Sequence, residues 1–469
     1  KYASPQGPSA LVSLSGFDSE GQDHTFEHPQ VGPVTAHGLD WDRAAKVFGQ
    51  AAWKGLTLTA AWSGRGKGQP TGAYGSLVDD PRNANHDARG FIELRYERSF
   101  ATATDLYGRA YYDSYRFEGY YAYPDEEAQD SKATLLNRDV AVGHWIGLEL
   151  RGVQTLFSKH RLVAGLELKR HLRQEQENFD EGGEVYLDDH RASTVFGTYL
   201  QGEVDLWGWA AINAGLRYDH YDSFGGTLHP RLAIIVTPFS STTLKLLYGR
   251  AFRPPNVEEL FYRDGYSYKV APSGSLGPEH VSTHEVVLEQ GLGRSVRLTV
   301  LGYHLVVRDL ISLVEDPADS LLYFTNQGSV DAFGGEAQVD VKGPWGTVGR
   351  ASYALQQATA VETGERLTNS PTHMAKLHLS APLYWRWLRA GAQLLYLDRR
   401  RTLSGAQVDP YLVSNLTVTA EGLGGVADVS ASVYNLFDVR YGDPGSREHF
   451  QDELLRDGRS FRLKLLLHF

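Results

Sequence analysis

The chain has 469 residues and carries 46 basic against 57 acidic residues, a formal net charge of −11. This balance argues against a nucleic-acid partner, and the absence of cysteine excludes disulfides, thiolate metal sites and cysteine nucleophiles. A prior of roughly 150 residues per domain suggests about three domains, but large all-β barrels depart from it. The longest uncharged run, residues 2–17, is rich in Ser, Gly and Pro, so no membrane-spanning helix is predicted.

The first residues, Lys1–Pro5, lack the charged and apolar segments of a signal peptide. Either the protein is cytoplasmic or an upstream part has been removed. The aromatic content is unusual, with 26 Tyr, 19 Phe and 9 Trp. Tyrosine in such excess is typical of strands and of boundaries between water and an apolar phase, where the ring is buried and the hydroxyl stays solvated.

Polar and apolar residues alternate along most of the chain, for example through residues 161–169, 336–342 and 461–469. Period two is the pattern of β-strands, and short helical turns are predicted only at Asp40–Lys46 and Val257–Phe261. A single open sheet rarely exceeds about 10 strands, so a longer unbroken series must close up or split. About 20 strands are predicted, and they begin near Ala10, Arg43, Leu56, Arg89, Asp105, Arg138, His160, Arg191, Trp209, Leu228, Thr242, His280, Ser295, Tyr323, Thr347, His373, Trp387, Tyr411, Val426 and Arg459.

The connections between these strands are expected to alternate strictly between short and long. Short ones include Lys54–Gly55 and Gly291–Gly293, and long ones include Asp18–Asp42, Arg253–Glu279 and Val439–Asp457. Ten long loops then fall at one end of the strands. This asymmetry is typical of a transmembrane β-barrel, which has short periplasmic turns and long extracellular loops.

Two other architectures explain part of the pattern. A β-propeller needs a repeat of about 40–45 residues, and none is visible. A soluble sandwich would show the same alternation, because one strand does not reveal whether its apolar face meets lipid or a core. Strand number, loop asymmetry and the aromatic last residue favour one all-β domain over residues 1–469, a large antiparallel transmembrane β-barrel. Its lumen face is predicted to include Glu336, Gln338, Asp340, Lys376, His378, Asp428 and Ser430.

The run Tyr248–Phe261 reads YGRAFRPPNVEELF and closely resembles a segment of TonB-dependent outer-membrane receptors. The segment Pro272–Glu279 departs from that family, since it is longer and lacks the Asn of the usual Asn-Pro-x-Leu-x-Pro-Glu stretch. Together the similarities cover essentially the whole chain, most clearly from residue 240 onward. Further matches follow in the expected order at Asn326–Gly328 with Gly335–Glu336, at Asn369–His373, at Asn435–Asp438 with Tyr441, and at Asp457–Phe461 with Phe469.

The resemblance implies a barrel of the 22-stranded type, with an N-terminal plug inside it and a TonB-box peptide for the TonB–ExbB–ExbD energy-coupling system. Nothing in the sequence resembles the plug, so we interpret the chain as the C-terminal barrel portion and expect the plug, the TonB box and about two strands upstream. The resemblance further implies the outer membrane of a Gram-negative bacterium, with contacts to its lipid and lipopolysaccharide. The implied activity is energy-coupled import of a scarce, large solute such as a ferric siderophore, haem or cobalamin. The alternatives are a passive porin-like channel and, less favoured, a soluble β-rich binding protein.

Enzyme signatures are missing, since no G-x-S-x-G, H-E-x-x-H or P-loop pattern occurs. The sequence therefore predicts no enzyme activity, no catalytic residue and no cofactor. His24, His28 and His37 fall in one predicted loop but have no strict metal-ligand spacing. We interpret them as solvated loop histidines, and no metal site is predicted.

Two clusters of charged residues can be interpreted either as binding sites or as ordinary solvated surface. Asp79–Asp80 with Asp87 offer carboxylate oxygens to Ca²⁺, but an acidic turn without an ion is the preferred interpretation. Arg399–Arg401 offer guanidinium groups to lipopolysaccharide phosphates, but an ordinary solvated rim is preferred.

Aromatic residues in two predicted extracellular loops are the best candidates for ligand contact. Aromatic side chains on loops offer flat, amphipathic contact area at low entropic cost, which suits a bulky aromatic or macrocyclic chelate. The alternative is an aromatic girdle or loop-on-loop packing. Local acidity at Asp125–Asp130 argues mildly against a strongly anionic ligand. The candidates are Tyr120, Tyr121 and Tyr123 in one loop, with Tyr262, Tyr266, Tyr268 and Arg253 in the other.

Overall fold

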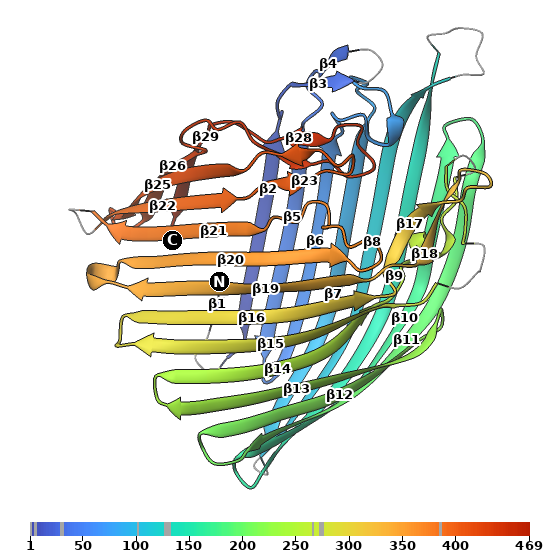
Figure 1. Ribbon diagram of the computed structural model, residues 1–469. Helices are drawn as coiled ribbons and strands as arrows, with labels where there is room; N and C mark the ends of the chain where they lie inside the picture. Colours follow the sequence, from blue (N-terminus) through green and yellow to red (C-terminus); the bar gives the residue numbers. More distant parts are fainter. Residues whose placement is uncertain are drawn as a thin grey trace.

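One antiparallel sheet of 21 strands dominates the computed structural model, and it curls round into a barrel (Figure 1). The model describes residues 2–3, 7–28, 32–100, 103–125, 133–264, 267–271, 276–383 and 387–469. Among these, β1 and β29 are the edge strands of the sheet. Its strands, in order of pairing, are β1 (Tyr2–Ala3), β2 (Ser9–Ser19), β5 (Asp42–Trp53), β6 (Leu56–Gly68), β7 (Ala84–Phe100), β8 (Thr104–Pro124), β9 (Thr134–Leu156), β10 (His160–Asp180), β11 (Val185–Asp205), β12 (Ala210–Tyr221), β13 (Gly225–Phe239), β14 (Thr242–Arg253), β15 (Glu279–Leu292), β16 (Val296–Arg308), β19 (Val330–Lys342), β20 (Val348–Ala360), β21 (His373–Pro382), β22 (Leu388–Leu397), β25 (Tyr411–Leu423), β26 (Ala427–Tyr434) and β29 (Ser460–Leu467).

The remaining elements are small and lie in the connections. Within the described ranges, no helix is both long enough and apolar enough to span a bilayer. Figure 1 shows the small hairpins gathered at the same end of the barrel, which we call the long-loop end. The elements are the hairpins β3–β4 (His24–His28, Gly32–Ala36), β17–β18 (Ile311–Glu315, Leu322–Asn326), β23–β24 (Arg400–Arg401, Gln407–Val408) and β27–β28 (Gly442–Pro444, Glu453–Leu455), the helix α1 (Val257–Phe261), and the 3-10 turns η1 (Ala73–Gly75) and η2 (Pro344–Gly346).

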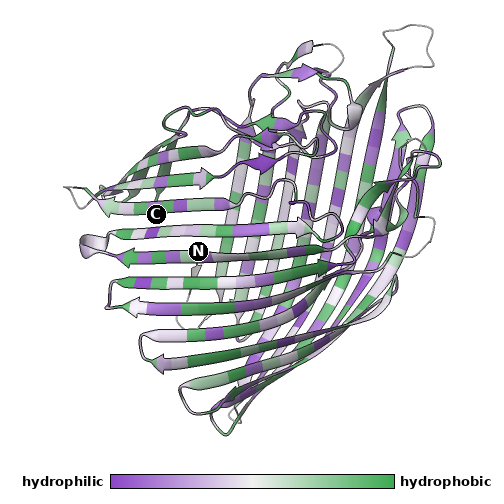
Figure 2. Ribbon diagram, in the orientation of Figure 1, coloured by the Kyte–Doolittle hydropathy of each residue, from purple (hydrophilic) through white to green (hydrophobic). Residues whose placement is uncertain are grey.

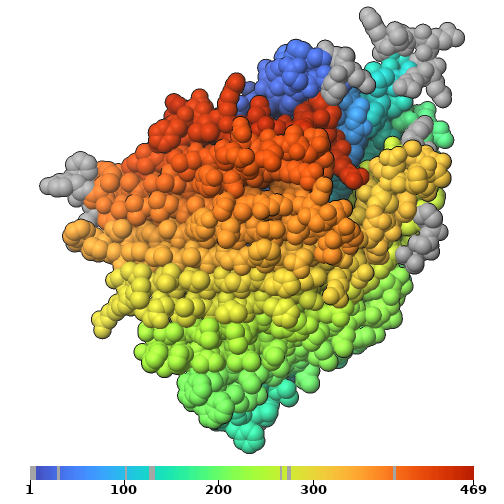
Figure 3. Space-filling view, viewed as in Figure 1, coloured from blue at the N-terminus to red at the C-terminus, as the bar shows by residue number. Residues whose placement is uncertain are grey.

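The outer face of the sheet carries an apolar band. Successive side chains of a strand point to opposite faces, and hydrophilic and hydrophobic residues alternate along many strands (Figure 2). A soluble monomer rarely exposes contiguous apolar patches beyond a few hundred Å², whereas a lipid-facing barrel surface is apolar throughout. The barrel strands from β12 to β16 and from β19 to β22 form a continuous outer wall in Figure 3. Exposed members of the band are Ile92, Leu94, Leu106, Ile146, Leu148, Leu150, Leu166, Leu168, Leu200, Leu216, Leu232 and Leu377.

The opposite face is polar, and ion pairs connect side chains of adjacent strands and of strands two places apart. Arg217 of β12 contacts Glu167 of β10 at 2.6 Å, and Arg350 of β20 contacts Asp340 of β19 at 2.6 Å. The register confirms the predicted lumen-facing set in β19 to β21, because Gln338 pairs with Ser352 and the latter with Lys376. The barrel therefore has the apolar exterior and polar interior that the alternation predicts.

Several predicted elements are confirmed and several are wrong. The helical turn at Val257–Phe261 is present as α1, but Asp40–Lys46 runs into strand β5, whose residues pair with both β2 and β6. The strand expected near Tyr323 is β18 of a separate hairpin, and the barrel strand β19 begins at Val330. Strict alternation of loop length is also wrong, because the turns after β10 and β12 at the long-loop end are tight.

Four neighbouring strands, β8 to β11, are much longer than the rest, with 21 to 23 residues each. On β9 the apolar band reaches Ile146, yet the strand continues to Thr134. We call the parts of these strands beyond the band the β8–β11 extension. It comprises residues 113–124, 134–145, 173–180 and 185–195.

Candidate ligand-binding surface

The connection between β14 and β15 crosses the opening of the barrel at the long-loop end. After Pro254–Pro255, α1 starts with a capping box, in which Asn256 Oδ1 accepts from the Glu259 N–H and the Glu259 carboxylate accepts from the Asn256 N–H, both at 2.8 Å. The loop reaches β10, four places away in the sheet, where Gln176 Nε2 donates to the carbonyl of Val257 at 3.1 Å. It is therefore held over the lumen rather than beside its own strands.

Arg253 fastens the two ends of this loop. Its guanidinium contacts Glu259 at 2.9 Å and Glu279 at 2.7 Å, and Glu279 also accepts from the Ile311 N–H at 2.8 Å. The Arg253 side chain is 43% exposed. Its geometry is that of a clamp between α1 and the start of β15, and its predicted contact with a ligand stays a prediction.

Tyr121 and Tyr123 lie on the inner face of β8 and pack against the β6–β7 connection. The Tyr121 ring meets Tyr74 of η1 edge to face at 5.3 Å, and its hydroxyl donates to Asn85 Oδ1 at 3.3 Å. The Tyr123 hydroxyl donates to the carbonyl of Tyr74 at 3.3 Å. Burial raises the pKa of Tyr74 to about 12, so the ring stays neutral and can donate a hydrogen bond. Tyr121 is 5% exposed, which leaves Tyr123 as the more accessible of the predicted pair.

Tyr120 points the other way. The expectation that these three tyrosines stand on a loop is wrong, because β8 continues to Pro124 and successive residues of a strand face opposite sides. The Tyr120 hydroxyl donates to Glu118 at 2.9 Å and accepts from Arg138 at 3.1 Å, on the outer face. Tyr120 therefore does not share a surface with Tyr121 and Tyr123.

Tyr262 and Tyr268 bring the second predicted group to the same opening. Tyr262 follows α1, and its hydroxyl accepts from Asn178 Nδ2 of β10 at 3.2 Å. The rings of Tyr262 and Tyr268 meet edge to face at 5.6 Å, and the Tyr268 N–H donates to Asp264 at 2.8 Å. Tyr266 lies outside the described residues. Two segments that are far apart in the sequence thus place tyrosines over one opening.

A partly buried acid, Asp139 of β9, lies beneath the crossing loop, and the sequence does not single it out. Burial, reinforced by the charges of Glu258 and Asp264, raises the pKa of its carboxyl to about 7, although a hydrogen bond from Asn178 opposes this shift. Burial and then the charge of Glu259 likewise raise the pKa of Glu258. Because Asp139 also raises the pKa values of the tyrosines on both sides, it marks the point where the two groups converge. We call Tyr74, Tyr121, Tyr123, Asp139, Glu258, Tyr262 and Tyr268 the rim cluster.

The rim cluster suits non-covalent recognition. Tyrosine hydroxyls, amides and a carboxyl that titrates near neutral pH donate and accept hydrogen bonds, while the rings offer stacking surface. Two inward-facing amides beside the rim cluster, those of Asn137 and Asn178, are themselves positioned, because Asn137 Nδ2 donates to Asn178 Oδ1 at 3.0 Å and to Asp180 at 2.9 Å. The only signal for this arrangement in the sequence is that Asn137 and Asp139 are two residues apart and therefore lie on the same face of β9. Inward-facing residues beyond the apolar band face the loop that covers the lumen.

The three loop histidines do not come together. His37 Nδ1 pairs with Asp79 at 3.1 Å, His24 Nε2 contacts Asp40 at 3.4 Å, and the ring of His28 packs on Phe450 at 4.8 Å. Their separate partners give no common centre for a metal ion.

The acidic turn is likewise divided among partners. Asp79 accepts from the backbone and ring of His37, Asp80 pairs with Arg82 at 2.6 Å, and Asp87 accepts from the Tyr115 hydroxyl at 3.0 Å. Asp79 thus joins the β6–β7 connection to the segment before β5, Asp80 pairs within the connection, and Asp87 joins β7 to β8, so the three carboxylates do not converge on one point.

The prediction that Arg399–Arg401 form a solvated rim is wrong for Arg400. Arg400 is 4% exposed and pairs with Asp443 at 2.6 Å, while Arg401 contacts Glu365 at 2.8 Å. Arg400 also donates to the carbonyl of Gly442 at 2.7 Å. A solvated rim is therefore the wrong description of Arg400, because the β23–β24 hairpin turns it inward onto β27.

Comparisons with known proteins agree with this architecture. Residues 15–436 match the family model described as "TonB dependent receptor-like, beta-barrel". The copper transporter OprC superposes with a TM-score of 0.76 at 16% identity, over 98% of this chain and 76% of that chain. The ferric-catecholate import receptor Fiu from E. coli K12 gives 0.75 at 13%, over 99% and 78%. A mutant of the ferric enterobactin receptor PfeA from Pseudomonas aeruginosa gives 0.76 at 15%, over 98% and 75%. At such identities these structures share the fold, and no curated sequence matches the chain.

Proposed function

The chain belongs to the TonB-dependent receptor family, and from that membership we propose that it binds a scarce, bulky solute at the cell surface and imports it with energy from the TonB–ExbB–ExbD system. The family consists of outer-membrane transport receptors, which supports the assignment of the long-loop end to the cell exterior. The apolar exterior of the barrel, with Leu148 and Leu150 exposed on β9, supports lipid as its surroundings.

The convergence of the rim cluster carries this proposal. The β14–β15 loop crosses the opening and presents Tyr262 and Tyr268 opposite Tyr121 and Tyr123. A plain pore needs no such cover, whereas a receptor needs a shaped surface that contacts the solute before it enters the lumen. Residues from both sides of the opening can close on one large ligand.

The cargo that fits best is a metal chelate of the siderophore, haem or cobalamin class. Structural neighbours named for copper, ferric-catecholate and ferric-enterobactin transport support a metal complex as cargo. The charge of the rim narrows the choice, because four carboxylates contribute to the electrostatics around its tyrosines, those of Asp139, Asp180, Glu258 and Asp264. A neutral or cationic complex is therefore favoured over a multiply anionic one.

A passive channel is the second candidate, and the polar lumen with its ion pairs supports it. The two differ in their need for energy. Import by the receptor stops when TonB is deleted or the proton gradient is collapsed, whereas diffusion through a channel continues.

The test measures uptake of isotopically labelled ferric siderophores, haemin and cobalamin by cells that express the full-length protein, with and without TonB. We expect saturable, TonB-dependent uptake of one class, weakened about tenfold or more by Tyr123→Ala, since such anchors carry about 2 kcal/mol or more. Tyr120→Ala is the matched control, because Tyr120 faces outward and should leave uptake unchanged. Uptake that ignores TonB would establish the channel, and equal losses in both variants would remove the rim cluster from recognition.

A further inference from the structure

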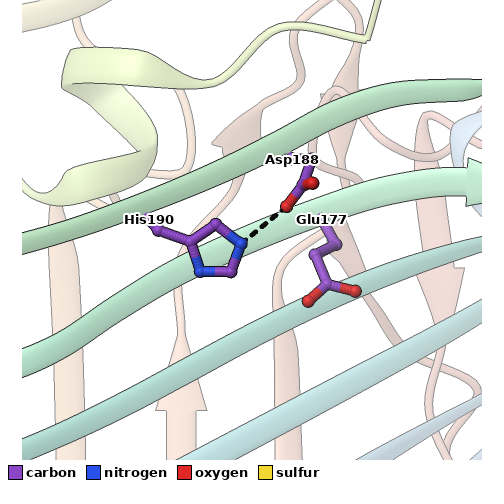
Figure 4. Close-up of side chains that lie close together, drawn as sticks. All are labelled: Glu177, Asp188 and His190. Atoms are coloured by element: carbon purple, nitrogen blue, oxygen red, sulfur yellow. Dashed lines mark hydrogen bonds and ion pairs between the residues drawn. The ribbon is translucent and has the colours of Figure 1, made fainter.

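A second cluster lies on the outer face of the β8–β11 extension, on the opposite side of the sheet from the rim cluster. Glu177 of β10 and Asp188 and His190 of β11 lie close together there (Figure 4), and one ligand atom from each lies within 4.8 Å of the others. We propose that these three residues form a surface site for a divalent transition-metal ion such as Zn²⁺, separate from the transported cargo.

The strand register places the three groups together without any loop. Glu177 pairs directly with Asp188, and Glu175 pairs directly with His190, two residues along the same hairpin. Like charges directly opposite each other destabilise a strand pair. Among the described residues the Glu177 carboxylate makes no hydrogen bond or ion pair. The charge of Arg173 acts on it, but that guanidinium is paired with Glu175, so it offsets the repulsion between Glu177 and Asp188 only in part. A bound cation between the two strands removes that repulsion.

The histidine is already oriented as a metal ligand. His190 Nε2 lies 2.7 Å from Asp188 Oδ1, and its Nδ1 lies 3.2 Å from Glu175 Oε1. Glu175 is in turn held by Arg173, whose Nε donates to it at 2.7 Å. A metal-bound histidine almost always donates its second ring N–H to a carboxylate or carbonyl, which fixes the ring and its tautomer. Glu175 supplies that support and leaves Nε2 directed at the two remaining carboxylates.

The types of ligand atom in the cluster indicate which class of metal ion it binds. One imidazole nitrogen and two carboxylates suit Zn²⁺ and related transition metals, whereas Ca²⁺ and Mg²⁺ prefer oxygen ligands only. Ligand distances of about 2.0–2.2 Å require only side-chain rotation toward a common centre, because the ladder already fixes the backbone. His190 and Asp188 are 56% and 63% exposed, so an ion enters from solvent and retains an open coordination position.

The experiment measures Zn²⁺ binding to the full-length protein in detergent, purified without a polyhistidine tag, by equilibrium dialysis with elemental analysis. We expect one site that is lost in His190→Gln and weakened at least tenfold in Glu177→Gln and Asp188→Asn. Glu175→Gln, which changes only the support of the ring, should weaken binding about 10–100-fold. The matched control is His144→Gln, because His144 faces outward on β9 beside the Tyr112 hydroxyl, 2.6 Å away, and should retain the site.

A second measurement does not depend on stoichiometry. Hydrogen exchange of residues 173–190 should slow on addition of Zn²⁺ in the unmodified protein and in His144→Gln, and should not respond in His190→Gln. Heat-modifiable gel mobility checks that every variant is folded. Binding that survives all three ligand substitutions, a Ca²⁺ affinity above that for Zn²⁺, or an unchanged exchange rate in the unmodified protein would each overturn the proposal.

Discussion

The two sides of the barrel are built differently. On one side β8 to β11 extend far beyond the apolar band, whereas β20, β21, β22, β25 and β26 have only 8 to 13 residues each. On that short side the rim at the long-loop end consists of separate hairpins, β23–β24 and β27–β28, joined by side chains such as Arg400. We call β8 to β11 the tall side and β20 to β26 the short side. The rim residues of the tall side lie on paired strands, and those of the short side lie on loops and small hairpins.

This difference shows where precise positioning comes from. A side chain on a paired strand has its direction fixed by the pleat, so Asn137, Asp139 and Asn178 face the lumen as a set. Functional groups on regular elements are held more precisely than those on loops. In the rim cluster, the strand residues of the extension provide a fixed wall, and the β14–β15 loop brings Tyr262 against it through Asn178.

The largest expected effect is a difference in stability between two substitutions on the tall side, one in the apolar band and one in the β8–β11 extension. Leu150 in the band and Val185 in the extension are 63% and 62% exposed, so they form a matched pair. Leu150→Arg should destabilise the protein by about 2–4 kcal/mol, because it places a charge near the middle of the lipid-facing band. Val185→Arg should change stability by less than about 0.5 kcal/mol, since it meets water. Denaturant unfolding in lipid vesicles measures both, and equal costs would show that the exterior does not face lipid.

The next effect tests whether the short side depends on side-chain contacts. Arg400→Met leaves the carbonyl of Gly442 unsatisfied and deprives Asp443 of one partner, so local opening of residues 398–411 should become easier by about 1–3 kcal/mol. Arg401→Met is the control, because its exposed pair with Glu365 is worth about 0–1 kcal/mol. Hydrogen exchange of this segment gives both values, and identical exchange in the two variants would contradict the role of Arg400.

The sequence predicts the parts that depend on local alternation. Nearly all predicted strand starts fall within a few residues of the observed ones, because the period-two pattern and the turns that interrupt it are local properties. Alternation does not identify the partner of a strand, so it predicts a barrel strand at Tyr323, which belongs to β18 of a separate hairpin. The same pattern does not show how far a strand continues beyond the apolar band, so it predicts a loop at Tyr120 where β8 in fact continues.

The candidate site was predictable only by residue type. The sequence singles out Tyr121, Tyr123, Tyr262 and Tyr268 as aromatic residues of two predicted extracellular loops, and the structure brings them to one opening. The importance of Asp139 depends on a loop that arrives more than 100 residues later in the chain, so no local pattern reveals it. Long-range placement is the information that the sequence pattern lacks.

A pH titration tests the tall side separately from the short side, because Asp139, whose carboxyl pKa is raised, lies on β9 of the tall side. Its pKa is about 7 in the folded protein against an ordinary value of 3.8, so the folded extension binds the proton more tightly than the opened one. Its contribution to stability is complete below about pH 4 and is lost as the pH rises through 7. Opening of residues 134–145, corrected for intrinsic exchange, should become at least about tenfold easier between pH 4 and 8, the effect of one coupled pKa unit.

Asp139→Asn should remove this dependence. Glu118→Gln on the outer face of β8 is the control, because hydrogen bonds from Arg116 and Tyr120 outweigh burial and keep the pKa of Glu118 below its ordinary value. That variant should retain the slope between pH 4 and 8. A slope that persists in Asp139→Asn would assign the titration to another group.

The smallest effect concerns the contact that joins the loop to the tall wall. Tyr262→Phe removes the hydroxyl that accepts from Asn178 Nδ2 at 3.2 Å but keeps the ring and its edge-to-face contact with Tyr268. Asn178 keeps its bond to Asn137 Oδ1 at 3.2 Å and loses only the second bond of its amide nitrogen, so the cost should be about 0.5–1.5 kcal/mol. Tyr268→Phe is the control, because the Tyr268 hydroxyl makes no hydrogen bond within the described residues and its loss should cost almost nothing. Hydrogen exchange of residues 256–262 measures the difference, and an equal response in the two variants would mean that ring packing, not the bond to Asn178, holds the loop over the lumen.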